Sequence, residues 1–153
     1  QGQIDADGML RITGRVKDLF KTSKGKYVAP APIEDRLVTH PAVEAACVSG
    51  GELAQPIALV MLNAVAAAQA EQAAGRTSLA TSLDAHLVAL NATLDPHEQL
   101  QCLVVMTEAW TVDNGLVTPT FKVRRNRVEE LFAQRYARWA EAGVRVVWSD
   151  AAA

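Results

Sequence analysis

Two short apolar runs in the first half of the chain constrain the fold more than any other feature. The runs are Val43–Ser49 and Ile57–Leu62, both rich in valine, isoleucine, leucine and alanine, and the turn-forming stretch GGELAQP separates them. Apolar runs of this length between glycine and proline residues are typical of β-strands. We therefore predict two paired strands here. A similar run, Leu100–Met106, predicts a third strand of the same sheet.

Helical patterns fill much of the remaining chain. The expected helices have either apolar residues at helical spacing or a high content of alanine, and they cover Ala31–His40, Ala64–Ala74, Ser78–Leu94 and Asn126–Ala142. We expect Gly75–Thr77 to break the second helix from the third. Asn126 is a candidate cap for the last helix, because asparagine side chains accept hydrogen bonds from free amides in a first turn.

Turn residues predict two short hairpins. The tetrad DADG lies between Gly2–Ile4 and Met9–Thr13, and the triplet DNG lies between Trp110–Val112 and Leu116–Thr118. Asp-Gly and Asn-Gly pairs favour tight hairpin turns because these residues tolerate positive φ. The predicted fold class is α+β, with a small central sheet of about three strands packed against helices. The short hairpins then lie at the start of the chain and before the loop that carries Lys122.

Size and charge exclude several classes of protein. The chain has 153 residues, half of them hydrophobic, which suits one domain with an ordinary core. A net charge of -2 argues against a general nucleic-acid binder. Since no apolar stretch could span a bilayer and no signal peptide is visible, we expect a cytoplasmic protein without a transmembrane segment, either free or peripheral to a membrane. The first residues begin inside a hairpin without an initiator methionine, which indicates a fragment of a longer polypeptide.

The cysteines and histidines do not predict a metal site. Cys47 and Cys102 each lie in an apolar run, so buried thiols are favoured over a disulfide or metal ligands. His40, His86 and His97 lack the short spacings that zinc ligands favour. We therefore expect no metal site on this chain.

Most lysines and arginines fall in two segments, residues 11–26 and 122–138. Solvated surface is the default interpretation of any single lysine, but this clustering indicates binding surfaces. The pair Gly25-Lys26 does not form a phosphate-binding loop of the Walker type, because Tyr27 stands where serine or threonine should bind magnesium.

Lys122 is the strongest candidate for chemistry. It follows Thr118-Pro119-Thr120, and the proline restricts the shapes available to the loop. A positioned ammonium group can stabilise charge that develops on a phosphoryl or carboxylate oxygen. The chain offers no evident nucleophile and no paired carboxylates at a useful spacing, so it carries only half of an active site.

Two motifs resemble those of a known family. The stretch GQIDADGMLRITGRVKDLFKTSKGKYVAPAPIEDRL is similar to the start of the C-terminal domain of the acyl-activating, AMP-forming adenylate synthetases. The stretch TPTFKVRR resembles their closing lysine motif in its long-chain fatty acid–CoA ligase form. Residues 63–100 carry no family motif.

The resemblance implies a division of labour. A large N-terminal domain would hold ATP, Mg²⁺ and a fatty acid or other carboxylic acid. A small mobile domain would swing between one pose for acyl-adenylate formation and another for thioester formation with coenzyme A. Residues 1–15 would be the end of the preceding domain or a hairpin leading to the hinge, and residues 16–153 would be the mobile domain. Without its partner domain this chain would be inactive.

The resemblance also implies roles for individual residues. Lys122 would bridge the substrate carboxylate and the α-phosphate during adenylation. Arg15 would contact the ribose of the adenylate, and the backbone of Lys17 would be the hinge. Lys21 and Gly25 would lie on the loop that faces coenzyme A in the thioester pose.

Several points stay open at this stage. Lys24 and Tyr27 depart from the family pattern, where a second glycine and an asparagine are common, so the shape of the coenzyme A tunnel is in doubt. Arg124 and Arg125 would either contact phosphates of coenzyme A or pair with acids of the other domain. An adenylating enzyme that passes its acyl group to a carrier protein is one alternative. A basic-patch module that binds RNA or an acidic protein is another.

Overall fold

A computed structural model describes residues 2–4, 10–12 and 19–150 of the chain. Two residues with roles implied by the family resemblance, Arg15 and Lys17, lie outside these described residues. The hairpin predicted at the start is confirmed, because β1 (Gly2–Ile4) pairs with β2 (Leu10–Ile12) in antiparallel fashion.

The centre of the domain is a mixed sheet of four strands in the order β5-β6-β7-β8. Their bounds are Val43–Ser49, Ile57–Leu62, Leu103–Met106 and Val146–Trp148. The first pair is antiparallel and the other two pairs are parallel. The predicted α+β class is confirmed, as are the three predicted strands. The fourth strand, β8, was not predicted from the sequence, because its three residues are too few to show a pattern.

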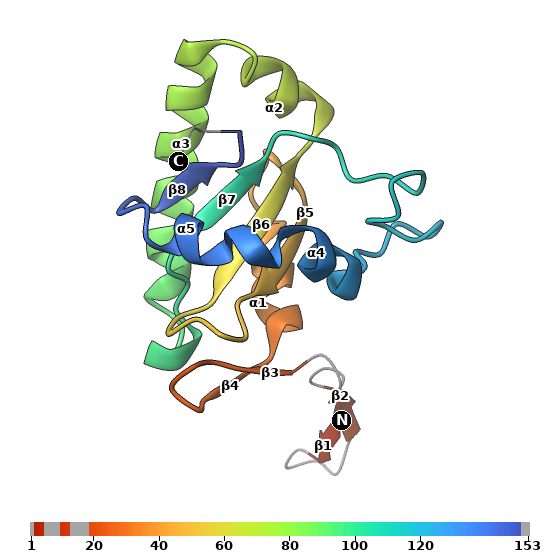
Figure 1. Ribbon diagram of the computed structural model, residues 1–153, viewed down its shortest axis with the longest axis vertical. Helices are drawn as coiled ribbons and strands as arrows, with labels where there is room; N and C mark the ends of the chain where they lie inside the picture. Colours follow the sequence, from red (N-terminus) through yellow and green to blue (C-terminus); the bar gives the residue numbers. More distant parts are fainter. Residues whose placement is uncertain (1, 5–9, 13–18, 151–153) are drawn as a thin grey trace.

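Helices cover both faces of this sheet, as Figure 1 shows. One face packs against α1 (Pro30–Leu37) and α3 (Ala73–Asn91), and the other packs against α4 (Arg125–Phe132) and α5 (Tyr136–Ala140). Along β6, Ala58, Val60 and Leu62 contribute to the first core, whereas Ile57, Leu59 and Met61 contribute to the second. Burial on both faces explains why this strand is apolar throughout rather than alternating.

The predicted break at Gly75–Thr77 is wrong. Helix α2 (Ala64–Gln69) ends earlier, and all three residues lie within the first turns of α3. A Cβ atom at position 75 would lie 1.8 Å from the carbonyl oxygen of Gln69. Gly75 therefore permits α3 to pass close to the end of α2, and it does not stop a helix.

The predicted hairpin around DNG is also wrong. Asn114 instead accepts hydrogen bonds through Oδ1 from the amides of Thr111 and Leu116, and Gly115 has φ of +79° in the same turn. Asparagine side chains often form such local bonds to the backbone in turns, and here these bonds shape the chain without a pair of strands. The chain reverses later, where Val117 forms an antiparallel bridge with Val123.

The last predicted helix is divided. α4 begins at Arg125, so Asn126 lies inside the helix and is not its cap. A 3₁₀ turn, Ala133–Arg135, connects α4 to α5. A second 3₁₀ turn, Pro96–Glu98, precedes β7. Within the described part of the chain, no helix is both long and apolar enough to cross a bilayer.

Candidate functional site

Lys122 lies at the end of a closed loop, Thr118–Lys122, which we call the lysine loop. The amide of Thr118 donates to the carbonyl of Lys122 at 2.8 Å, and the amide of Phe121 donates to the carbonyl of Thr118 at 2.8 Å. The amide of Lys122 donates to Oγ1 of Thr118 at 3.0 Å. These bonds close a hairpin of three loop residues, a common type whose last loop residue is left-handed.

The sequence of the lysine loop suits this shape. Pro119 occupies the position of the turn where a fixed φ near -65° is favourable. Phe121 has φ of +60°, a conformation that a bulky residue adopts at an energetic cost. The hydrogen bonds within the lysine loop therefore hold Phe121 in a backbone conformation that its bulky side chain disfavours.

The side chain of Lys122 points to solvent. The residue is exposed, and among the described residues its ammonium group takes part in no ion pair. The segment between β7 and α4 that contains it projects away from the sheet in Figure 1. The ammonium group can thus reach a molecule or a domain outside this fold.

Arg125, three residues after Lys122, holds the beginning of α4 to the rest of the domain. Its Nη1 lies 2.6 Å from Oε2 of Glu34 and its Nη2 lies 3.1 Å from Oε1, so the guanidinium grips the carboxylate with both nitrogens. Nη1 also donates to the carbonyl of Val48 at 2.8 Å. Neither alternative stated above for Arg125 describes this contact, because the acid belongs to the same domain. Arg124 is exposed, and its role stays open.

Next to this pair, polar groups are buried between β5 and the helices α4 and α5. The hydroxyl of Ser49 donates to Oε1 of Glu129 at 2.9 Å. Burial raises the pKa of the Cys47 thiol to about 12 and also raises the pKa of Tyr136. A thiol with such a pKa is protonated at neutral pH and is a poor nucleophile. Cys47 and Cys102 are buried free thiols, as the sequence predicted.

Lys21 and Gly25 lie on a second hairpin, in which Lys21 is the last residue of β3 (Phe20–Lys21) and Gly25 belongs to the turn before β4 (Tyr27–Val28). Gly25 has φ of +81°, and a Cβ atom there would lie 3.7 Å from Cε of Lys21. The Lys21 ammonium lies 5.9 Å from the ring centre of Tyr27, which is largely exposed. The structure thus brings Lys21 and Gly25 together on one hairpin, whereas Lys122 belongs to a separate loop.

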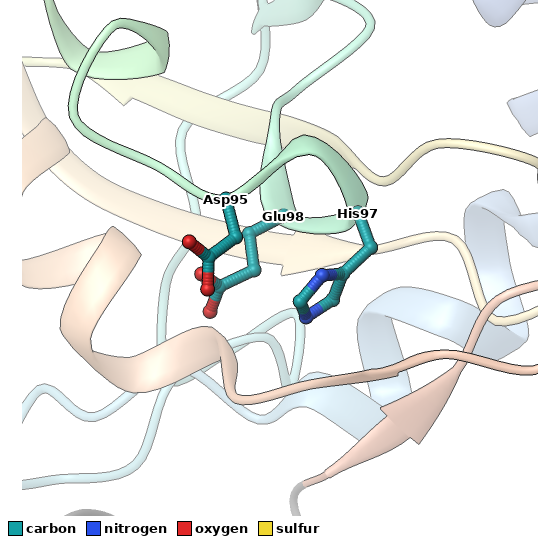
Figure 2. Close-up of side chains that lie close together, drawn as sticks. All are labelled: Asp95, His97 and Glu98. Carbon is teal, nitrogen blue, oxygen red and sulfur yellow. The ribbon is translucent and has the colours of Figure 1, made fainter.

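One cluster of potential metal ligands was missed by the sequence analysis, which considered only histidine spacing. Asp95, His97 and Glu98 lie around the 3₁₀ turn before β7, and one ligand atom from each lies within 4.8 Å of the others. Figure 2 shows the three side chains on the same side of the turn. The cluster offers three ligand atoms, fewer than the four of a structural zinc site, and Asp95 is exposed. We assign no metal to it.

The other two histidines have structural partners. Nδ1 of His40 accepts from the amide of Ala42 at 3.0 Å, so Nε2 carries the proton and donates to Oγ of Ser82 at 2.8 Å. His86 Nε2 donates to the carbonyl of Arg36 at 3.1 Å. Burial, together with the neighbouring His86, lowers the pKa of His40. These contacts join α1 to α3.

Comparison with known proteins gives consistent matches. Residues 17–138 match the family described as AMP-binding enzyme C-terminal domain. The chain is 34% identical to the long-chain-fatty-acid–CoA ligase FadD15 of Mycobacterium tuberculosis, over 86% of this chain and 24% of that protein. It is 27% identical to a chloroplastic long-chain-fatty-acid–[acyl-carrier-protein] ligase of Arabidopsis thaliana, over 79% of this chain and 16% of that protein.

The fold has close counterparts among solved structures. The adenylation domain of a carboxylate reductase from Mycobacterium chelonae superposes with a TM-score of 0.70 and 24% identity, over 90% of this chain and 24% of that one. The chain spans about a quarter or less of the curated relatives that it matches. From the family match over residues 17–138, we conclude that the chain belongs to the AMP-binding enzyme C-terminal domains, here with relatives among the long-chain fatty acid–CoA ligases.

Proposed function

We propose that residues 16–153 work as the mobile C-terminal domain of an ATP-dependent, AMP-forming fatty acid–CoA ligase. Residues 1–15 would then be the end of the preceding domain or a hairpin leading to the hinge. Family membership supports the domain assignment, and curated relatives such as FadD15 support the fatty-acid substrate. The single observation that carries the proposal is the exposed ammonium group of Lys122 on a self-closed loop.

Lys122 would act in the first half-reaction. A carboxylate oxygen of the fatty acid attacks the α-phosphorus of ATP, the bond from that phosphorus to the bridging oxygen breaks, and pyrophosphate leaves. An ammonium group between the carboxylate and the α-phosphate brings two anions together and stabilises the charge of the transition state. ATP and Mg²⁺ would be held mainly by the large domain.

The other residues would act when the domain changes its pose. In the second half-reaction the thiol of coenzyme A attacks the acyl carbonyl and AMP leaves. Lys21 and Gly25 would face the active site at that stage, on a hairpin separate from the lysine loop. Arg15 would contact the ribose, and rotation about Lys17 would exchange the two loops.

The test uses the full-length ligase with Lys122→Ala. We expect adenylation, followed by pyrophosphate exchange, to fall by at least about 100-fold, as for loss of one charge-stabilising donor in an active site. Thioester formation from supplied acyl-AMP should change little, because the lysine loop is withdrawn in that pose. Equal loss of both half-reactions would contradict the assignment.

A second acceptor deserves comparison, because one relative is named as an acyl-carrier-protein ligase. In that case the acyl group would pass to the thiol of a carrier protein and not to coenzyme A. Turnover of full-length ligase with each acceptor, at the same acyl-AMP concentration, decides between them. No contact in the described part of the chain favours the RNA-binding alternative.

A further inference from the structure

We propose that Arg125 and Glu34 form a positioning pair that aims Lys122 during adenylation. The proposal rests on the function proposed above, in which Lys122 serves the first half-reaction. Neither Arg125 nor Glu34 would touch the substrates. Their effect would be transmitted through the backbone that joins the lysine loop to α4.

The bonds within the lysine loop fix its shape but not its direction. Pro119, Thr120, Phe121 and Lys122 are all exposed, so packing of their side chains does not hold the loop to the domain. The direction of the ammonium group must therefore be set where the two ends of the loop meet the fold. On the N-terminal side this is Val117, which is 2% exposed.

On the C-terminal side, Val123 pairs with Val117 and packs against the second core, and the amide of Arg124 donates to the carbonyl of Leu116 at 2.8 Å. Arg125, the next residue, is the first to anchor this side to α1 and β5 through its side chain. No side chain caps the beginning of α4, because Arg124 occupies the cap position without a capping hydrogen bond. The first turn of this helix is instead fixed by the fork of Arg125 on Glu34 and by the bond from Nη1 to the carbonyl of Val48.

Glu34 is itself held in place by the central sheet. Its Oε2 accepts a hydrogen bond from the amide of Val48 at 2.7 Å, so Glu34 and Arg125 together use both backbone groups of that residue. The two side chains are only 18% and 21% exposed. The start of α4 is thus tied to α1 and to the edge strand β5 through one compact set of charge-assisted bonds.

This geometry depends on arginine. A lysine at position 125 keeps the positive charge but has one nitrogen, so it cannot hold both carboxylate oxygens and the Val48 carbonyl in a planar fork. With lysine at position 125, the domain should still fold, but the start of α4, which follows the lysine loop, would be held less firmly. Displacement of a catalytic group by about 1 Å can cost about 100-fold in rate.

The experiment compares Arg125→Lys with Arg76→Lys in the full-length ligase. Arg76 makes a similar two-nitrogen pair with Asp150 at 2.9 and 2.7 Å, on α3 and away from the lysine loop. We expect Arg125→Lys to lower kcat of adenylation by about 10- to 100-fold. KM for ATP and the rate from supplied acyl-AMP should stay within about threefold. Arg76→Lys should leave both half-reactions unchanged.

A second variant, on the other side of the pair, tests whether a slower rate comes from lost positioning and not from misfolding of Arg125→Lys. Glu34→Gln keeps an oxygen that can accept from the Val48 amide while it removes the charge that Arg125 grips. We expect it to slow adenylation selectively as well. The double variant should be no slower than Arg125→Lys alone, because both changes break the same pair.

The outcomes separate this proposal from the proposed function. If Lys122→Ala loses adenylation but Arg125→Lys and Glu34→Gln do not, the positioning role is wrong and the function stands. If Lys122→Ala keeps adenylation, the proposed function itself fails. If both pair variants slow the two half-reactions equally, or lose activity only in proportion to lost folded protein by circular dichroism, the pair is merely structural and the positioning role is overturned.

Discussion

The domain presents two loops that share one backbone design, Thr22–Lys26 and Thr118–Lys122. In each, the threonine amide donates to the lysine carbonyl at 2.8 Å. The last residue between them also donates its amide to the threonine carbonyl, at 2.9 Å from Gly25 and at 2.8 Å from Phe121. The lysine amide in turn donates to the threonine Oγ1, at 3.4 and 3.0 Å respectively. Both loops therefore end in an exposed lysine presented in the same way.

The loops differ in how they are attached. The first loop is docked on the body of the domain, since Thr22 is 3% exposed and the amide of Ser23 donates to the carbonyl of Leu53 at 3.0 Å. The second loop projects from the domain beyond the Val117–Val123 bridge, and the Arg125 pair ties the start of the following helix, α4, to α1. The same backbone design thus occurs once in a loop fixed against the domain and once in a loop that extends from it, as the proposed exchange of two poses would require.

The largest expected effect separates the two lysines. In the full-length ligase, Lys26→Ala should leave adenylation within about threefold of the wild-type rate, whereas Lys122→Ala should lower it by at least about 100-fold. Lys26 and Lys122 occupy equivalent backbone positions in their loops, but only Lys122 should contribute strongly to adenylation. Pyrophosphate exchange measures both variants, and similar losses would show that the docked loop also serves adenylation.

A smaller effect concerns the left-handed residue. Gly25→Ala should lower the free energy of unfolding by about 1 kcal/mol, because alanine disfavours φ of +81° while its Cβ meets no clash. Gly143→Ala is the matched control, since Gly143 has φ of +79° and open space around it. Denaturant titration should give similar losses for both. Only Gly25→Ala should slow thioester formation, and a slowing by Gly143→Ala would remove the link to the loop.

The smallest expected difference between the two loops, about 0.5 kcal/mol in stability, concerns the threonine hydroxyls. Thr118→Val removes the acceptor for the amide of Lys122 at 3.0 Å, and we expect a loss of about 1 kcal/mol in stability. Thr22→Val removes the longer bond at 3.4 Å and should cost less through that bond, about 0.5 kcal/mol. Denaturant titration of the two variants provides the comparison. A larger loss for Thr22→Val would show that packing around this buried residue outweighs its hydrogen bond.

Sequence patterns predicted the elements whose local signals agree with their surroundings. Val43–Ser49 and Ile57–Leu62 match their observed strands, because burial on both faces left a continuous apolar run. The wrong predictions concern segments whose structure depends on contacts with distant parts of the chain. Gly75 was predicted to break a helix, but it lies inside α3 and allows this helix to pass close to α2. The strand Val146–Trp148 is too short to show a pattern by itself.

The candidate site was predictable to a similar degree. The proline and the family resemblance indicated Lys122 and its loop, and the structure shows that residue exposed on a closed turn. The partner of Arg125 could not be predicted, because Glu34 lies 91 positions away in the sequence. The roles of Arg15 and Lys17 stay predictions, since both lie outside the described residues.

The position of β8 has a practical consequence for expressing this domain alone. The family match stops at residue 138, yet Val146–Trp148 covers the outer side of β7, and the Ser149 amide donates to the carbonyl of Val105. A protein that ends at residue 138 would lack β8, so the apolar strand β7 would have unpaired backbone groups along one edge. Such open edges recruit neighbouring molecules, so the shortened product should precipitate. An expression boundary no earlier than Asp150 keeps β7 paired on both sides and leaves only the short strand β8 at that edge.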